Sequence, residues 1–113
     1  MSRQRSGAKV LRNAAPVFAA LGDETRLRLV SRLCEGGPIS IARLSAGADV
    51  TRQAITKHLL VLADAGLVHG ARRGRERIWE LEPEPLAQAR QYLDRISQEW
   101  DQALGRLKAF VED

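Results

Sequence analysis

Residues 51–66 read TRQAITKHLLVLADAG, and the rest of the chain is interpreted outward from this stretch. Side chains about 100° apart around a helix axis separate here into two stripes, so the spacing predicts an amphipathic helix. Thr51 is a suitable N-cap, because its hydroxyl can accept a hydrogen bond from a free N–H of the first turn. Gly66 can adopt the left-handed conformation that often ends a helix. The predicted inner face consists of Ala54, Ile55, His58, Leu59, Val61, Leu62 and Ala65.

The other face of this helix gathers polar side chains near its N-terminus, namely Arg52, Gln53, Thr56 and Lys57, with Thr51 beside them. A guanidinium, an amide, a hydroxyl and an ammonium are groups that contact base edges and phosphates in a major groove. We therefore interpret the stretch as a DNA-recognition helix, with Gln53 and Thr56 as the best candidates for base reading. His58 is expected to have a structural or phosphate-contacting role. The alternative for this helix alone is an ordinary solvated polar face.

The residues before Thr51 predict the first half of a helix-turn-helix over residues 40–65. Ser40 can cap a short helix, and Gly47 to Val50 supply a tight turn into the recognition helix. Further upstream, Asp23 can cap a helix over residues 23–35. The apolar spacing of that helix places Cys34 on its buried stripe, together with Leu27, Val30 and Leu33. Cys34 is therefore predicted to be a packed thiol rather than a redox switch.

After Gly66 the pattern changes from helical to strand-like. Residues 67–69 and 78–81 are β-prone, and the sequence GARRGRER between them has a glycine at its tip, so residues 67–81 predict a β-hairpin, or wing. Four arginines in the predicted loop are candidates for phosphate or minor-groove contacts: Arg72, Arg73, Arg75 and Arg77. The alternative is a solvated surface hairpin. His69 is expected to be a strand residue without a special role.

Both ends of the chain predict helices that require a partner. Between residues 85 and 111 apolar residues recur at steps of three and four, as in a heptad seam. This stripe is more than a small winged helix can cover, so a homodimer is expected, with a second interface helix over residues 9–21. The alternative is that the C-terminal helix folds back on its own core. The candidate interface residues are Leu11, Phe18, Leu86, Leu93, Ile96, Trp100, Leu104, Leu107 and Phe110.

Two further features of the N-terminal segment lead to expectations about its structure. Pro16 predicts a turn or a fresh helix start, because proline disrupts a helix interior. Residues 1–8 are polar and basic without periodicity, and they predict a disordered arm. Residues 9–113 are then expected to form a single winged-helix domain. The predicted fold is mainly α with a small β-hairpin, flanked by N- and C-terminal dimerisation helices.

Composition narrows the class of function. The 113-residue chain has a net charge of +4, and its basic middle, residues 51–77, contrasts with an acidic C-terminal part, which suggests a polyanion contact. The single cysteine precludes an intramolecular disulfide, and no apolar run approaches a membrane span, so a cytoplasmic protein is expected. The sequence contains no glycine-rich phosphate loop and no evident nucleophile–base pair, which argues against an enzyme.

Several segments resemble the ArsR/SmtB family of small bacterial winged-helix repressors. The first is FAALGDETRLRL at residues 18–29. The second is TRQAITKHL at residues 51–59, followed by Leu62 and by AGLV at residues 65–68. The third consists of RGR at residues 73–75 and WEL at residues 79–81. The likeness covers roughly residues 14–82. It implies a homodimer that binds an inverted repeat in double-stranded DNA and represses by blocking the promoter.

The sequence departs from the metal-sensing members of that family. The stretch IARLSA at 41–46 has no cysteine or histidine, and the C-terminal helix has no histidine. Its Asp94, Glu99 and Asp101 alone would make a poor site for a thiophilic or borderline metal. No metal site and no cofactor are therefore expected, whereas an unknown small-molecule effector or a redox signal at Cys34 stays open. A winged-helix protein–protein interaction module is the other alternative.

Overall fold

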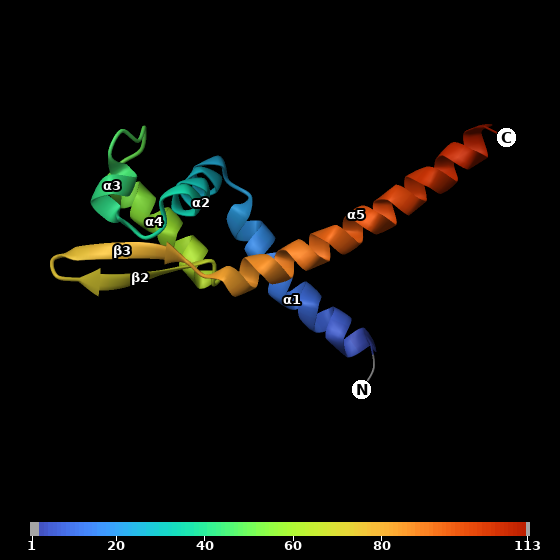
Figure 1. Ribbon diagram of the computed structural model, residues 1–113, viewed down its shortest axis with the longest axis horizontal. Coiled ribbons are helices and arrows are strands. Elements are labelled where there is room, and N and C mark those ends of the chain that lie inside the picture. The colour runs from blue at the N-terminus through green and yellow to red at the C-terminus, as the bar shows by residue number, and fades with distance from the viewer. Residues whose placement is uncertain (1–2, 113) are drawn as a thin grey trace.

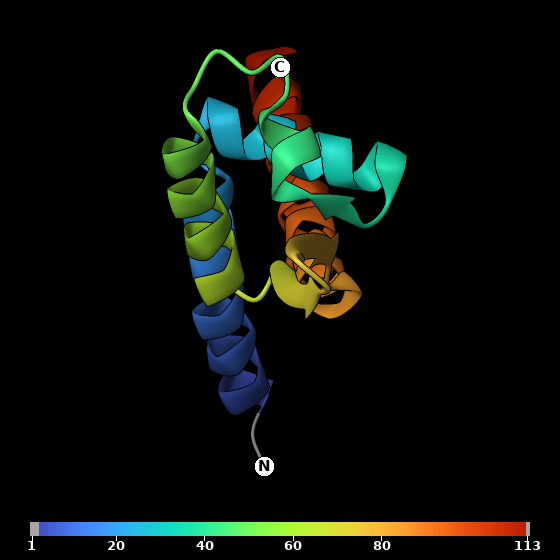
Figure 2. The same cartoon turned by 90° about the vertical axis from the view of Figure 1, so that its left-hand side faces the viewer.

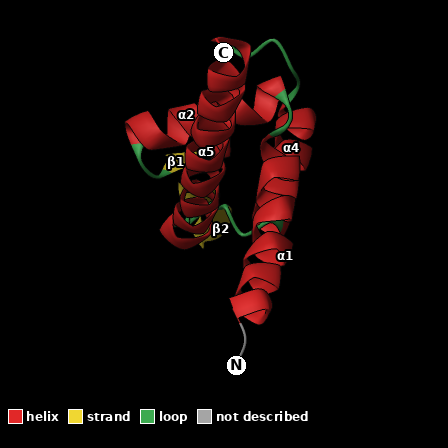
Figure 3. Cartoon of the chain, turned by 90° about the vertical axis from the view of Figure 1, so that its right-hand side faces the viewer, coloured by secondary structure: helices red, strands yellow, loops and turns green. Residues whose placement is uncertain are grey.

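A computed structural model describes residues 3–112 of the chain, with the side chains of residues 9 and 11–112 (Figure 1). The fold is mainly helical with a small antiparallel sheet, as predicted (Figure 3). None of the described helices combines the length and apolar character that a membrane span requires. The elements in chain order are α1 (Arg3–Leu21), α2 (Glu24–Gly36), β1 (Ile39–Ser40), α3 (Ile41–Ser45), α4 (Arg52–Asp64), β2 (Val68–Arg73), β3 (Glu76–Leu81) and α5 (Pro83–Glu112).

Side-chain caps fix the starts of the three helices α2, α3 and α4. Each predicted cap accepts a hydrogen bond from the backbone N–H three residues later: Asp23 from Arg26 at 3.0 Å, Ser40 from Arg43 at 3.2 Å and Thr51 from Ala54 at 3.1 Å. These bonds satisfy N–H groups that have no partner within the helix. Gly66, with φ of 80°, lies just beyond the end of α4, where a left-handed residue was predicted.

The core lies beneath α4. Ile55, Leu59 and Leu62 of α4 are almost completely buried, at the i, i+4, i+7 spacing of one helix face. Val61, which was predicted on the same face, lies at its margin and is 40% exposed. Trp79 of β3 is also buried and joins the same cluster. Helix α4 is therefore anchored to the sheet as well as to the other helices.

The sheet has three strands in the order β1-β3-β2, not the two of a simple hairpin. The two-residue β1 pairs antiparallel with β3, in a register that places Ile39 opposite Trp79. The hairpin strands are also longer than predicted, since β2 and β3 continue as far as Arg73 and Glu76. Strand pairing needs only backbone hydrogen bonds, so the solvated end of a wing can stay paired without apolar side chains.

Two predictions about the N-terminal segment are wrong. Helix α1 begins at Arg3, so residues 3–8 are helical rather than disordered, and residues 1–2 lie outside the described part of the chain. The helix also continues through Pro16. A proline removes one hydrogen bond, here to the Arg12 carbonyl, but the buried side chains on either side of it hold the helix in place. These side chains are Ala14, Val17 and Ala20.

The prediction of a packed Cys34 is also wrong, because the thiol is exposed. The buried residues of α2 are Leu29 and Leu33, and Leu27 of the predicted stripe is half-exposed. Cys34 follows Leu33 by about 100° around the axis, which turns it out of this narrow stripe. It also lies in the last turn of α2, where few elements remain to cover it.

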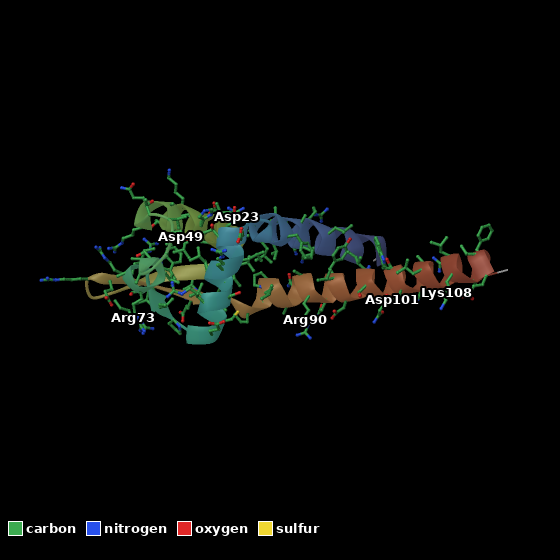
Figure 4. All side chains as sticks on the ribbon, turned by 90° about the horizontal axis from the view of Figure 1, so that it is seen from above. Asp23, Asp49, Arg73, Arg90, Asp101 and Lys108 are labelled. Atoms are coloured by element: carbon green, nitrogen blue, oxygen red, sulfur yellow. The ribbon has the colours of Figure 1, made fainter. Side chains whose placement is uncertain are left out.

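Helices α1 and α5 cross each other, and α5 then extends away from the winged-helix part (Figure 1). Phe18 and Tyr92 meet at this crossing with ring centroids 6.3 Å apart. Asp101 and Lys108 mark the part of α5 that reaches beyond α1 (Figure 4). The molecule measures 65 × 38 × 20 Å and its radius of gyration is 18.4 Å, whereas a compact domain of this length has about 13 Å. A single chain therefore leaves much of α5 uncovered.

Candidate nucleic-acid interface

The outer face of α4 presents the polar side chains predicted for base and phosphate contacts. Arg52, Gln53 and Lys57 are exposed, and Thr51 lies beside them at the N-cap. Thr56 is half-buried, and its hydroxyl donates a hydrogen bond to the Arg52 carbonyl at 3.0 Å. The oxygen of that hydroxyl remains free to accept a hydrogen bond from a partner.

His58 lies on the inner side of α4 and is held by α2. The Arg26 guanidinium donates to His58 Nδ1 at 3.2 Å, and its Nε donates to the Ala20 carbonyl at the end of α1 at 2.5 Å. Asp23 Oδ2 lies 3.8 Å from the same His58 nitrogen. A hydrogen bond from the Arg26 backbone N–H, with the nearby Arg26 charge, holds the pKa of Asp23 below its usual value. His58 thus joins a polar network that connects α1, α2 and α4.

The wing arginines differ in position more than the sequence suggested. Only Arg75 lies in the turn, whereas Arg72 and Arg73 belong to β2 and Arg77 belongs to β3. The strand register places Arg72 opposite Arg77 and Arg73 opposite Glu76. The prediction of four loop arginines is therefore corrected to one turn residue and three strand residues, because the paired strands continue almost to the tip.

Arg77 packs back along the wing over Trp79, and its side chain remains exposed. Its guanidinium carbon lies 5.1 Å from the centroid of the Trp79 ring, a favourable cation–π geometry. Gly70 makes room for this arrangement, since a Cβ there would lie 2.9 Å from Arg77 Nε and 3.2 Å from the Trp79 ring. Arg77 and Trp79 also line a groove of about 310 Å³ between the wing and α4, whose other lining residues are Ile41, Arg52, Thr56 and Leu60.

Replacing Gly70 with alanine is expected to lower the free energy of unfolding by about 1–3 kcal/mol, because the added methyl group overpacks a contact that the buried Trp79 cannot relieve. Urea denaturation would measure the change. Gly36→Ala is the control, because a Cβ at Gly36 meets nothing within 4 Å. Equal stability of the Gly70 variant and the wild type would show that Arg77 does not pack tightly over residue 70.

His69 has more contacts than expected for an ordinary strand residue. Its Nε2 lies 2.6 Å from Glu80 Oε1, and its Nδ1 contacts the carboxylate of Glu82. Both contacts are at the root of the wing, on the sheet face opposite Trp79, because side chains alternate between faces along a strand. The histidine thus links the hairpin to the segment that leads into α5.

Comparison with known proteins identifies the family. A helix-turn-helix domain model matches residues 21–71. An uncharacterized HTH-type transcriptional regulator of Bacillus subtilis is 40% identical over 80 residues, which cover 66% of this chain and 87% of the relative. The arsenical resistance operon repressor of Escherichia coli is 33% identical over 93 residues, 80% of each chain. A solved ArsR-like transcriptional regulator from Rhodococcus has a TM-score of 0.71 at 37% identity, covering 88% of this chain and 93% of that one. The chain belongs to the ArsR family of helix-turn-helix transcriptional regulators.

Two arginines in and beside the helix-turn-helix of this ArsR-family regulator were not predicted from the sequence. Arg43 is exposed on α3, the helix that crosses the DNA backbone in such motifs. Arg32 of α2 donates to the Leu44 and Arg43 carbonyls at 2.6 and 3.0 Å, and so caps the end of α3. The positive charge of Arg43 on a predicted first helix was a usable signal, whereas the Arg32 contact depends on tertiary structure.

The candidate dimer residues of the ArsR-family chain fall into two groups. Leu86 packs against the core of its own chain, and Ile96 is half-buried. The others are exposed, with Trp100 at 65% and Phe110 at 80%. Only Ala89 of α5 is buried. The exposed members of the group are Leu11, Phe18, Leu93, Trp100, Leu104, Leu107 and Phe110.

Proposed function

We propose that this ArsR-family regulator is a homodimeric, sequence-specific repressor that binds an inverted repeat and blocks the promoter, without a metal cofactor. The observation that carries the proposal is that one chain has two separate surfaces. One is a cationic face on α4 and the wing, and the other is an uncovered apolar stripe along α5. Figure 2 shows α4 and the hairpin side by side, so the cationic groups of both can meet one duplex.

The apolar stripe supports association of two chains. Large aromatic and aliphatic side chains are exposed along several turns of α5, and soluble monomers rarely leave such a patch uncovered. Two copies joined by α5 and α1 would present two recognition helices related by a two-fold axis. Such dimers read half-sites about 34 Å apart, one turn of DNA, which is why their operators are palindromic.

Within each half-site we assign different roles to different groups. Gln53 and Thr56 would read base edges, because these side chains share the N-terminal part of the outer face. Arg52, Lys57 and arginines of the wing would contact phosphates. The hydrogen bonds of His58 to α2 support a structural role for that histidine rather than base reading.

Metal-independent control is supported by the donor atoms in the chain. Arsenical and other soft metal ions select thiolate ligands, and a single cysteine cannot supply a set of thiolates within one chain. The one thiol, Cys34, lies at the end of α2, and α5 contains neither histidine nor cysteine. Among residues 3–112, no three histidine, cysteine or acidic side chains are grouped in a way that could hold a metal ion.

The experiment that tests this proposal is a fluorescence-anisotropy titration of the purified protein against duplex from its own upstream region and against a scrambled duplex, with and without chelator. We expect tight, salt-sensitive and chelator-indifferent binding to the upstream duplex alone. Equal weak binding to both duplexes would reject a sequence-specific regulator of this region. A loss of binding on adding chelator would reject metal independence.

The matched variant in that titration is Gln53→Ala. It is expected to weaken binding to the upstream duplex by about 1–3 kcal/mol and to leave binding to the scrambled duplex unchanged, because only a base contact is removed. If the variant retains both affinity and discrimination, the assignment of the reading face is wrong.

A further inference from the structure

The wing has two chemically different faces. Because directly opposed residues of antiparallel strands share a face, the register places Gly70, Arg72, Arg77 and Trp79 on one side. Trp79 is buried against the core, and Arg77 lines the groove beside α4, so this is the inner face. The outer face carries His69, Arg73, Glu76 and Glu80.

Acidic residues are confined to one of these faces. On the outer face, Arg73 lies opposite Glu76, and His69 lies opposite Glu80 with its Nε2 2.6 Å from Glu80 Oε1. On the inner face, Arg72 lies directly opposite Arg77, and no carboxylate lines the groove that Arg77 shares with Arg52. Like charges directly opposite each other destabilise a sheet. An anion bound beside Arg77 would reduce that repulsion.

The groove also contains groups that suit a tetrahedral anion. Arg52 and Arg77 approach it from the recognition helix and from the wing, and Thr56 lines the same groove. Arginine binds phosphate oxygens through two parallel N–H donors. Stacking on Trp79 restricts the Arg77 guanidinium before any ligand arrives, so less side-chain entropy is lost on binding.

We infer that Arg77 and Arg52, with Arg72 opposite Arg77 in the sheet, form a binding site for one DNA phosphodiester between the wing and the recognition helix. One strand of the duplex then passes through the groove, whereas Arg73 lies opposite Glu76 on the outer face and makes no phosphate contact. The inference rests on the proposed function only in taking duplex DNA as the ligand. It does not depend on an operator, because phosphate contacts are independent of base sequence.

The test is the salt dependence of binding to a random-sequence duplex, measured by anisotropy between about 50 and 200 mM salt. Arg77→Gln is expected to weaken binding and to lower the slope of log K against log salt by about 1 per bound protomer, because one phosphate contact releases about 0.9 counterions. Arg73→Gln, which removes the same charge from the same hairpin, is expected to leave the slope unchanged. Arg77→Lys separates charge from stacking, and it should keep the slope while binding more weakly.

Each other outcome overturns the assignment. Equal slope losses in the Arg77→Gln and Arg73→Gln variants would show that the wing acts as diffuse positive charge. A weakened Arg77→Gln variant with an unchanged slope would show that Arg77 only supports the structure of the wing. Wild-type protein without salt-sensitive binding to any duplex would reject the proposed function together with the site, which distinguishes that failure from the other two.

Discussion

Replacement of both Leu104 and Leu107 by glutamate is expected to convert the protein into a monomer and to weaken operator binding by about 10²–10⁴-fold. Both leucines are at least half-exposed on the part of α5 that reaches beyond α1. In the proposed dimer, binding of one recognition helix holds the second at a high effective concentration near its half-site. Carboxylates buried in an apolar seam are strongly unfavourable, so the variant loses that gain.

Light scattering would give the mass of the variant, and anisotropy its affinity. The control is the double replacement of Gln98 and Gln102 by glutamate, which adds the same charge to exposed positions on the opposite side of α5. The control should remain dimeric with unchanged operator affinity. A Leu104/Leu107 variant that is still dimeric would place the interface elsewhere on the chain.

Trp79→Ala is expected to lower the free energy of unfolding by about 3–5 kcal/mol, the usual cost of removing a large buried aromatic side chain. Trp79 is 2% exposed and lies between its strand partners Ile39 and Gly70. Its loss leaves a cavity beneath α4 and removes the support of Arg77. Since small domains are stable by only about 5–15 kcal/mol, much of the folded state's stability would be lost.

Urea denaturation followed by circular dichroism would measure this effect. Arg75→Ala at the wing tip is the control, because Arg75 is exposed and such substitutions usually change stability by less than about 0.5 kcal/mol. If the Trp79 variant were as stable as the control, Trp79 would not be part of the cooperative core.

The helix-turn-helix could be predicted from sequence because its signals are local. Ser40 and Thr51 each cap a helix through the N–H three residues ahead, and Ile55, Leu59 and Leu62 repeat at helical spacing. Such signals need no knowledge of distant parts of the chain. The polar residues on the outer face of α4 are also close together in the sequence, so the candidate base-reading residues could be predicted from it.

The features that the sequence did not reveal depend on contacts between distant segments. The pairing of Ile39 with Trp79 adds a third strand through two residues that have no strand signal of their own. The division of the wing arginines between two faces depends on a register that only the turn at Gly74 determines. Cys34 was predicted to be buried because its spacing from the other apolar residues of α2 fits one helix face. The width of the buried part of that face is set by the elements that pack against α2, and Cys34 lies outside it.

The contacts of Arg26 have a consequence for the spacing of bases in the operator. One guanidinium joins the last turn of α1 to His58 in the recognition helix. In the proposed dimer α1 belongs to the interface, so the recognition helix is connected to the two-fold axis through a few rigid contacts rather than a flexible linker. One extra base pair between half-sites rotates them by roughly 34–36° around the DNA axis, given 10–10.5 base pairs per turn. Recognition helices fixed to the two-fold axis in this way have little freedom to follow that rotation. The protein should therefore select the length of the spacer between half-sites as strictly as it selects the bases of the half-sites.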